Sequence, residues 1–232
     1  MPQPQPPQNR TIAIGDIHGC NTMLIALLDA ISPTPSDMLI FLGDLIDRGA
    51  DSKGVIDTIR ALESRCTVIR ILGNHEEMMF RARVYADERR SWLYFGGAEA
   101  LESFGAPPTA VGLAAVPPDY WTWLKGAKDY HETDKFIFCH ATPDPDKPMS
   151  EQSSDTWRWR HLHGLPHRHI SGKTIVCGHS EQRDGDVYYM DGLICLDTYA
   201  YGGGRLSGLD VVTGTLWQVD SELQVYQSTL PM

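Results

Sequence analysis

The stretch TIAIGDIHG, residues Thr11–Gly19, decides how this chain folds. An apolar run leads directly into a glycine-flanked turn that carries Asp16 and His18. The same arrangement returns in MLIFLGDLIDRG, residues Met38–Gly49, and in TVIRILGNHE, residues Thr67–Glu76. Continuous apolar runs of this kind are typical of strands buried on both faces. The sequence therefore predicts three strands that each end in a polar turn.

Helical patterns separate these three strands. Residues 21–31 and 52–62 repeat apolar side chains at helical spacing, and Asp51 or Ser52 is suited to cap the second helix. This alternation of strands and helices predicts a parallel sheet with right-handed crossovers. Because ligands collect at the carboxyl ends of such strands, we expect the three polar turns to meet at one edge of the sheet.

The later part of the chain follows a different pattern. Residues 77–130 contain three tryptophans and two proline pairs, and we interpret them as a mostly helical insertion that covers the site. Strands are expected at residues 136–139 and 174–177. Two hairpins follow at residues 187–196 and 206–219, because Asp-Gly and Thr-Gly pairs favour tight turns.

Composition narrows the class of protein. The chain has 232 residues, 42% of them hydrophobic, and a formal net charge of -10, whereas a nucleic-acid-binding domain usually presents a basic face. Its five cysteines form no CxxC pair, which favours buried free thiols in a reducing compartment. Residues 1–10 are rich in Pro and Gln and resemble no secretory signal. We expect a disordered leader at 1–10, one domain at 11–232, a cytoplasmic location, and no nucleic-acid or membrane partner.

The turns carry ligands that suit divalent cations. Asp16 and His18 are two positions apart on one loop, so both side chains can reach one ion. Asp44 follows one strand-helix unit later and could bridge two cations through its two oxygens. Asn74 follows after another such unit, and its amide oxygen can ligate a metal without adding charge. A single turn of this kind could be purely structural, but three in succession favour a dinuclear site.

Neighbouring residues suit phosphate chemistry. The Arg48 guanidinium matches the geometry of a phosphate group. His75 points away from Asn74 and is better placed as a general acid for the leaving oxygen, with Asp47 holding its other ring nitrogen. His140 and His179 each follow an apolar run. Alone, either would be read as a buried structural histidine, but beside the other motifs both are read as metal ligands.

The remaining histidines are expected to be solvated, although the group at 161–169 could also line the cleft. They are His131, His161, His163, His167 and His169.

These motifs together resemble a known family. GD-x-HG, GD-x-x-DRG and GNHE, followed by two separated histidines, are similar to the PPP-type metallophosphatases of the calcineurin-like superfamily, especially the small bacterial and phage (lambda-type) protein phosphatases. The resemblance covers roughly residues 11–219. It implies an α/β (α+β) fold, a four-layer α/β/β/α sandwich of two mixed sheets with helices outside. It also implies two divalent metal ions per chain. Mixed oxygen and nitrogen ligands without thiolate suit Mn²⁺ as the first expectation, with Fe or Zn²⁺ as alternatives.

The resemblance also assigns roles to residues. One metal would be held by Asp16, His18 and Asp44, and a second by Asp44, Asn74, His140 and His179. Substrate phosphate would contact Arg48, Asn74, His75 and a later arginine, which is Arg160 or Arg158. Two phasings of the motif fit, and we favour Arg160.

The chain departs from the family pattern at three places on the rim of the site. Thr142 follows His140-Ala141, Ser180-Glu181 follows His179, and Tyr199 follows Asp197-Thr198. None of these departures removes a ligand, but they leave the substrate preference open.

The sequence thus predicts a metal-dependent phosphomonoester hydrolase. We expect a protein Ser/Thr phosphatase, with phosphotyrosine as a further substrate class, that works by direct attack of a metal-bridging water. The alternatives are a symmetrical dinucleoside tetraphosphate hydrolase and a metal-dependent scaffold without catalysis. A phosphodiesterase or nuclease fits these motifs less well, and the oligomeric state stays open.

Overall fold

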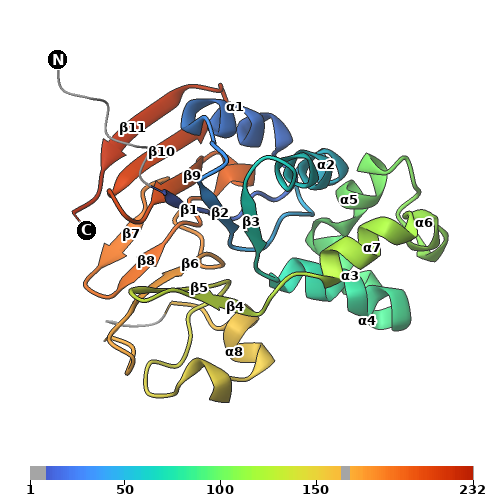
Figure 1. Cartoon of the computed structure of the whole chain (residues 1–232). Coiled ribbons are helices and arrows are strands. Elements are labelled where there is room, and N and C mark those ends of the chain that lie inside the picture. The colour runs from blue at the N-terminus through green and yellow to red at the C-terminus, as the bar shows by residue number, and fades with distance from the viewer. Residues whose placement is uncertain (1–8, 163–167, 232) are drawn as a thin grey trace.

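Two mixed β-sheets form the centre of the molecule, as the computed structural model of residues 9–162 and 168–231 shows (Figure 1). The first sheet has the strand order β11-β10-β9-β1-β2-β3. Its strands are β1 (Thr11–Ile14), β2 (Met38–Phe41), β3 (Thr67–Arg70), β9 (Arg205–Asp210), β10 (Thr215–Asp220) and β11 (Val225–Thr229). The first three strands are parallel, while β9, β10 and β11 are antiparallel.

The second sheet has the order β4-β5-β6-β8-β7. Its strands are β4 (Tyr130–Glu132), β5 (Phe136–Cys139), β6 (Thr174–Cys177), β7 (Tyr188–Met190) and β8 (Leu193–Cys195). The three central strands are parallel, and the two edge strands are antiparallel to them.

The helices lie outside the two sheets. They are α1 (Asn21–Ile31), α2 (Ser52–Leu62), α3 (Asn74–Val84), α4 (Ala86–Trp92), η1 (Leu93–Gly97), α5 (Ala98–Ser103), α6 (Ala110–Ala115), α7 (Pro118–Lys125), η2 (Met149–Glu151), α8 (Ser154–Trp159) and η3 (Ala200–Gly202). The predicted bounds of α1 and α2 are confirmed, and Asp51 caps α2 by accepting a hydrogen bond from the Gly54 amide at 2.8 Å.

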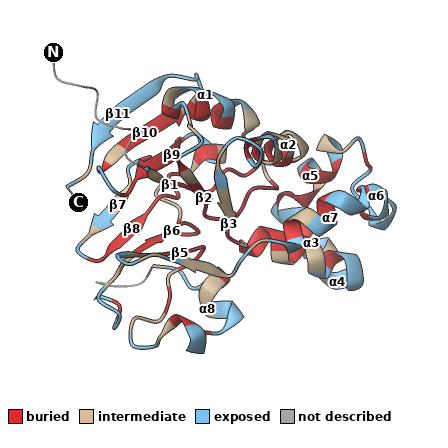
Figure 2. Ribbon diagram, viewed as in Figure 1, coloured by how far each residue is buried: buried red, intermediate tan, exposed pale blue. Residues whose placement is uncertain are grey.

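Alternation along the strands divides the core into layers. In β1, Ile12 and Ile14 pack against the helices, while Ala13 faces the second sheet. In β5, Phe138 meets that same inter-sheet layer, and Ile137 faces the far side. This period of two is what a pleated strand imposes. The result is the predicted four-layer arrangement, with buried strands at its centre (Figure 2).

The predicted insertion is helical, as α3 to α7 show. These helices gather beside β3 (Figure 1), and their buried Trp92 and Trp121 belong to the same hydrophobic cluster as α1 and α2. Two side chains of this region, Met78 and Phe95, line the same pocket as Asp44 and Arg48. The insertion therefore packs on the core of the first sheet and reaches the site.

The predicted hairpins are confirmed, and the predicted burial of the cysteines is confirmed in part. Both hairpins form, β7-β8 and β9-β10. Cys139, Cys177 and Cys195 are buried free thiols, but Cys20 and Cys66 are half-buried. In the part of the chain that the structure describes, no helix is both long and apolar enough to cross a membrane.

The predicted leader lies largely outside the described residues. Its last residue, Arg10, belongs to the folded part, because its guanidinium pairs with Asp37 at 2.6 Å. The Arg10 carbonyl also accepts a hydrogen bond from the Met38 amide at 2.9 Å.

Candidate metal and phosphate site

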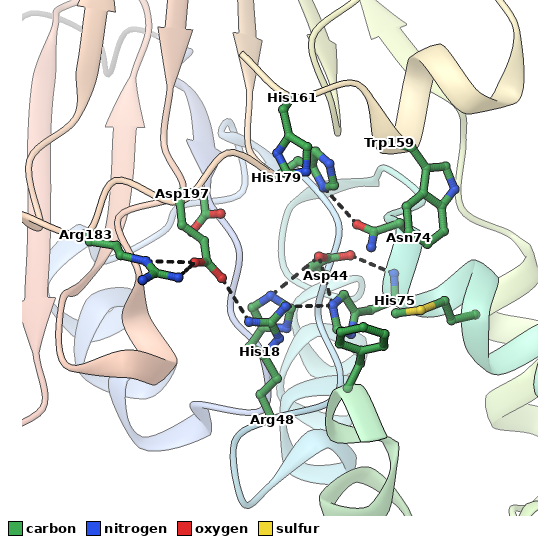
Figure 3. A pocket seen from close by; sticks show the side chains of 13 residues that line it. His18, Asp44, Arg48, Asn74, His75, Trp159, His161, His179, Arg183 and Asp197 are labelled. Carbon is green, nitrogen blue, oxygen red and sulfur yellow. Dashed lines mark hydrogen bonds and ion pairs between the residues drawn. The ribbon is translucent and has the colours of Figure 1, made fainter. Parts of the chain in front are cut away.

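The three polar turns meet in one pocket at the carboxyl ends of the strands. The cavity has a volume of about 460 Å³, and its wall is formed by His18, Asp44, Arg48, Asn74, His75, Met78, Phe95, Trp159, His161, His179, Glu181, Arg183 and Asp197. These residues come from both sheets and from the helical insertion (Figure 3). The expectation that parallel strands deliver their polar turns to one edge is confirmed for these residues.

Asp44 lies at the centre of the site, between two groups of ligands (Figure 3). Its Oδ2 atom is 3.5 Å from His18 Nε2, and its Oδ1 atom is 3.4 Å from His140 Nε2. Burial acts to raise the pKa of Asp44, but the four surrounding histidines outweigh it and hold this pKa well below its usual value. The carboxylate is therefore ionised and faces one imidazole with each oxygen.

The ligating histidines are oriented by backbone carbonyls. His18 Nδ1 donates to the Ile46 carbonyl at 3.0 Å, and His140 Nδ1 donates to the Leu42 carbonyl at 2.8 Å. Burial lowers the pKa of both rings, which keeps them neutral. Each Nε2 atom thus carries a lone pair and faces the Asp44 carboxylate, an arrangement typical of metal-binding histidines.

Asn74 brings the second group of ligands together. Its Oδ1 atom is 2.9 Å from His140 Nε2 and 3.0 Å from His179 Nδ1. Because His140 already donates through Nδ1, its Nε2 lone pair faces the amide oxygen with no proton between them. A shared cation would stabilise two such atoms.

Two sets of side chains in the described residues could each hold a metal ion, because within each set the ligand atoms lie within 4.8 Å of one another. The first set is His18, Asp44 and His75. The second is Asp44, His140 and His179. The second set matches the predicted second metal, apart from Asn74, which contributes an amide. The first set contains His75 where the resemblance implies Asp16.

Asp16 is nevertheless buried next to His179, one of the ligands of the second set. Its Oδ2 atom accepts a hydrogen bond from the His179 amide at 3.0 Å, while its Oδ1 atom is buried without a hydrogen-bond partner among the described residues. Burial, together with the charges of Asp197 and Asp44, raises its pKa well above the usual value. Three buried carboxylates with one orphaned oxygen fit a site that is completed by cations.

His75 is held by Asp47, and Asp47 is held in turn by Trp92. His75 Nδ1 donates to Asp47 Oδ2 at 2.7 Å, and the same oxygen accepts from Trp92 Nε1 at 2.8 Å. Burial lowers the pKa of His75, but Asp44 and Asp47 outweigh it and raise that pKa above the usual value. The ring therefore presents Nε2 to the pocket in an environment that favours its protonated form.

Arg48 lies beside His75 at the pocket wall. Its Nη2 atom is 3.3 Å from His75 Nε2, and its backbone amide donates to the Gly96 carbonyl at 3.1 Å. Gly96 has φ 113°, and a Cβ atom there would lie 2.3 Å from the Arg48 nitrogen. The helical insertion thus fixes the backbone of the predicted phosphate-binding arginine.

Glu76, the last residue of GNHE, supports the turn that carries Asp44. Its carboxylate accepts hydrogen bonds from the Asp44 amide at 3.0 Å, the Leu45 amide at 2.8 Å and the Gly73 amide at 3.0 Å. Burial raises its pKa to about 7. Glu76 is therefore a positioning residue that the sequence analysis left without a role.

Several site residues adopt left-handed backbone conformations. These are His18, Asp44, Asp47, Arg48 and His179, with φ between 46° and 72°. For residues other than glycine such conformations cost about 1–3 kcal/mol each and cluster at functional sites. The turns hold their ligands at the expense of local backbone strain.

The predicted second phosphate arginine does not line the pocket. Arg160 is 44% exposed and lies 3.9 Å from Asp144. Arg158 is buried in ion pairs with Glu77 and Asp129. Helix α8 ends at Trp159, which faces the pocket. Arg158 lies within the helix, and Arg160 follows it in an extended conformation.

Arg183 and Glu181 line the pocket. Glu181 was expected on the rim of the site, whereas Arg183 was not predicted to take part. Glu181 follows His179 by two positions, the same spacing at which Asp16 and His18 were expected to reach one ion. The signal was therefore present in the sequence.

The other histidines differ in where they lie. His161 lines the pocket and stacks on His179 with ring centroids 4.4 Å apart. His169 is buried, contrary to the expectation that it is solvated, and hydrogen-bonds Lys147 and Ser171. His131 is half-buried in β4. His163 and His167 lie outside the described residues.

The sequence profile of the calcineurin-like phosphoesterases matches residues 10–193. This chain belongs to that family. The match includes every predicted metal ligand, from Asp16 to His179, and it ends before the β9-β10 hairpin.

Relatives with different printed activities share parts of the sequence. The chain is 45% identical over 85 residues to serine/threonine-protein phosphatase 1 of Salmonella typhimurium, covering 36% of this chain and 37% of that protein. It is 42% identical over 176 residues to a symmetrical bis(5'-nucleosyl)-tetraphosphatase of Stutzerimonas stutzeri, covering 67% and 62% respectively. The chain thus matches less than two thirds of the length of each relative.

Solved structures show the same fold. A candidate diadenosine tetraphosphatase superposes with a TM-score of 0.66 at 23% identity, covering 95% of this chain and 93% of that one. A cold-active protein-tyrosine phosphatase of a Shewanella species superposes with a TM-score of 0.64 at 15% identity, covering 95% and 80%. At these identities the likeness concerns the fold alone.

Proposed function

We propose that the chain is a metal-dependent phosphomonoester hydrolase that acts on phosphorylated serine and threonine in proteins, with phosphotyrosine as a further substrate. The observation that carries this proposal is the position of Arg48 Nη2, 3.3 Å from His75 Nε2 at a pocket centred on Asp44. One guanidinium and one acid group side by side suit a single phosphoryl group and its leaving oxygen.

The ligand set for two divalent ions would be Asp16, His18, Asp44, Asn74, His140 and His179. Mixed oxygen and nitrogen donors without thiolate suit Mn²⁺ first, with Fe or Zn²⁺ as alternatives. When bound, the ions would supply positive charge and lower the pKa of water.

The chain's own residues would perform the remaining steps. Arg48 would bind the equatorial oxygens of the phosphoryl group and orient it. His75 would donate a proton from Nε2 to the departing alkoxide, and Asp47 would keep the ring in place through Nδ1. Water would attack the phosphorus atom directly as the bond to the leaving oxygen breaks, so the products would be the free alcohol and inorganic phosphate.

The pocket wall favours a monoester over a longer polyphosphate. Apart from histidines, the cationic residues among the described ones that line it are Arg48 and Arg183, and the carboxylates are Asp44, Glu181 and Asp197. A tetraphosphate chain carries negative charge well beyond the reacting phosphoryl group, and this wall offers few cations for it.

Symmetrical dinucleoside tetraphosphate hydrolysis is the second candidate. It is supported by the printed activity of the Stutzerimonas stutzeri relative, whose alignment reaches further along this chain than that of the Salmonella phosphatase. The exposed aromatic rings of Phe95 and Trp159 at the pocket would also suit a nucleobase.

A side-by-side assay tests the proposal. The purified protein with Mn²⁺ is incubated with phosphoserine, phosphothreonine and phosphotyrosine peptides and with diadenosine tetraphosphate, with Asp44→Asn as the inactive control. We expect phosphate release from the peptides with the larger kcat/KM. Turnover of the dinucleotide alone would contradict the proposal in favour of the second candidate.

A further inference from the structure

The loop after His179 places a carboxylate on the phosphate-binding wall. Glu181 Oε1 accepts a hydrogen bond from Arg48 Nη1 at 2.9 Å and another from the Tyr201 hydroxyl. Its second oxygen, Oε2, accepts from Arg183 Nη2 at 3.2 Å. Glu181 therefore joins the two arginines of the pocket wall.

The setting of this carboxylate is defined on several sides. The Arg48 guanidinium lies over the Tyr201 ring at 4.3 Å, so the arginine is fixed from below as well as through Glu181. The Glu181 side chain is 21% exposed, whereas that of Arg183 is 74% exposed. Glu181 thus presents its charge to the partly desolvated part of the wall, where charges interact more strongly than in bulk water.

We propose that Glu181 is a specificity-determining residue that discriminates against substrates with negative charge beyond the reacting phosphoryl group. It offsets the charge of Arg48 and Arg183, so a single phosphoryl group meets the Arg48 fork while an adjoining phosphate or acidic group meets the carboxylate. This inference deepens the proposed function and rests on it, because it assigns the monoester preference to one residue.

Two effects of Glu181 can be separated. It holds the Arg48 guanidinium in place, which affects every substrate through the shared phosphoryl group. It also repels additional negative charge, which affects only the more highly charged substrates. The ratio of kcat/KM for two substrates cancels the first effect and retains the second. Because the second effect is electrostatic, added salt should weaken it.

The test measures kcat/KM for diadenosine tetraphosphate relative to p-nitrophenyl phosphate in the metal-loaded protein. A substrate that binds without turnover is measured as a competitive inhibitor of the other. Glu181→Gln removes the negative charge but keeps the size of the side chain. Arg183→Gln removes a positive charge from the same wall, and Glu132→Gln is the matched control. Glu132 is a carboxylate paired with Lys173 at 2.8 Å outside the pocket.

We expect Glu181→Gln to raise the ratio roughly threefold to tenfold at low salt, and Arg183→Gln to lower it. Both changes should shrink in about 0.5 M NaCl, because the Debye screening length is ~10 Å at about 0.1 M salt and shorter at higher concentrations. The control Glu132→Gln should leave the ratio unchanged. An unchanged ratio in both pocket variants, or equal shifts in the control, would overturn the inference. If Glu181→Gln is unstable in urea titrations, the exposed Arg183→Gln variant decides.

The two proposals fail in different ways. Absence of phosphopeptide turnover in the wild type would contradict the proposed function. An unaltered charge discrimination in the variants would contradict the role of Glu181, whichever substrate the wild type prefers.

Discussion

His75 Nδ1 donates a hydrogen bond of 2.7 Å to Asp47 Oδ2, and both side chains are buried. The carboxylate only accepts, so the shared proton belongs to the ring and Nε2 is left for the pocket. This pair comes from two turns, Met38–Gly49 and Thr67–Glu76, that the parallel sheet brings together.

The first prediction concerns proton donation by His75. His75→Asn should lower kcat about 10²- to 10⁴-fold toward phosphoserine peptides, because an alkoxide leaves poorly without a proton. The loss should be smaller for p-nitrophenyl phosphate, whose leaving group needs less protonation. Steady-state kinetics with both substrates checks this, with His131→Asn as control. Equal losses on both substrates would contradict the role of acid.

The second prediction concerns the contact between Gly96 and Arg48. Gly96→Ala should raise KM about tenfold, because the new Cβ would displace the Arg48 backbone and with it a charge-assisted contact worth about 1.5–3 kcal/mol. Gly105→Ala is the matched control: Gly105 also has positive φ, 68°, but its Cβ would meet nothing within 4 Å in the described structure. Equal effects of both variants would show that backbone strain alone is responsible.

The third prediction concerns Glu76 and the turn that it supports. Glu76→Gln should lower the free energy of unfolding by about 1–3 kcal/mol, because the new amide nitrogen cannot accept from the backbone amides that Glu76 now binds. Urea denaturation measures this, with the exposed Glu99→Gln as control. A variant as stable as the control would contradict the positioning role.

The fourth prediction concerns pH and the pair Arg10–Asp37. Burial acts to raise the pKa of Asp37, but hydrogen bonds from Arg10 and Thr34 outweigh it and hold this pKa below the usual value. A carboxyl with a lowered pKa in the folded state contributes stability that is present above its unfolded pKa, about 3.9, and is lost as the pH falls through the lower folded value.

Asp37→Asn should therefore cost about 2 kcal/mol of unfolding free energy at neutral pH. The difference from the wild type should shrink below about pH 4. Urea titrations at several pH values measure it, with the exposed Asp29→Asn as the matched control variant. A difference that stays constant down to acid pH would contradict the ionic contribution of Asp37.

Much of the fold could be predicted from local patterns. The runs at Thr11, Met38 and Thr67 are strands because their apolar side chains serve two packed layers, and the Asp-Gly turn at residues 191–192 forms because Gly192 adopts φ 87°. Strand β11 has no such signal, since all its residues are exposed and it is held at the sheet edge by pairing with β10.

The candidate site shows the same division. Its turns could be read from sequence because glycine and polar residues follow each strand directly. The second arginine could not, because its position depends on where the short helix α8 ends and how it packs: Arg158 lies within this helix, and Arg160 follows it in an extended conformation. Arg183 reaches the pocket from the loop that also carries His179 and Glu181, and the course of this loop could not be predicted from local patterns.

The central claim is that Asp44 joins two cation sites, and metal analysis of active protein tests it most directly. Elemental analysis combined with anomalous scattering from crystals of the Mn²⁺-loaded protein should reveal two ions, one on each side of the Asp44 carboxylate, and Asp44→Asn should lose both. A fully active wild-type protein with no ion pair at Asp44, or an Asp44→Asn variant with full metal content, would contradict the account.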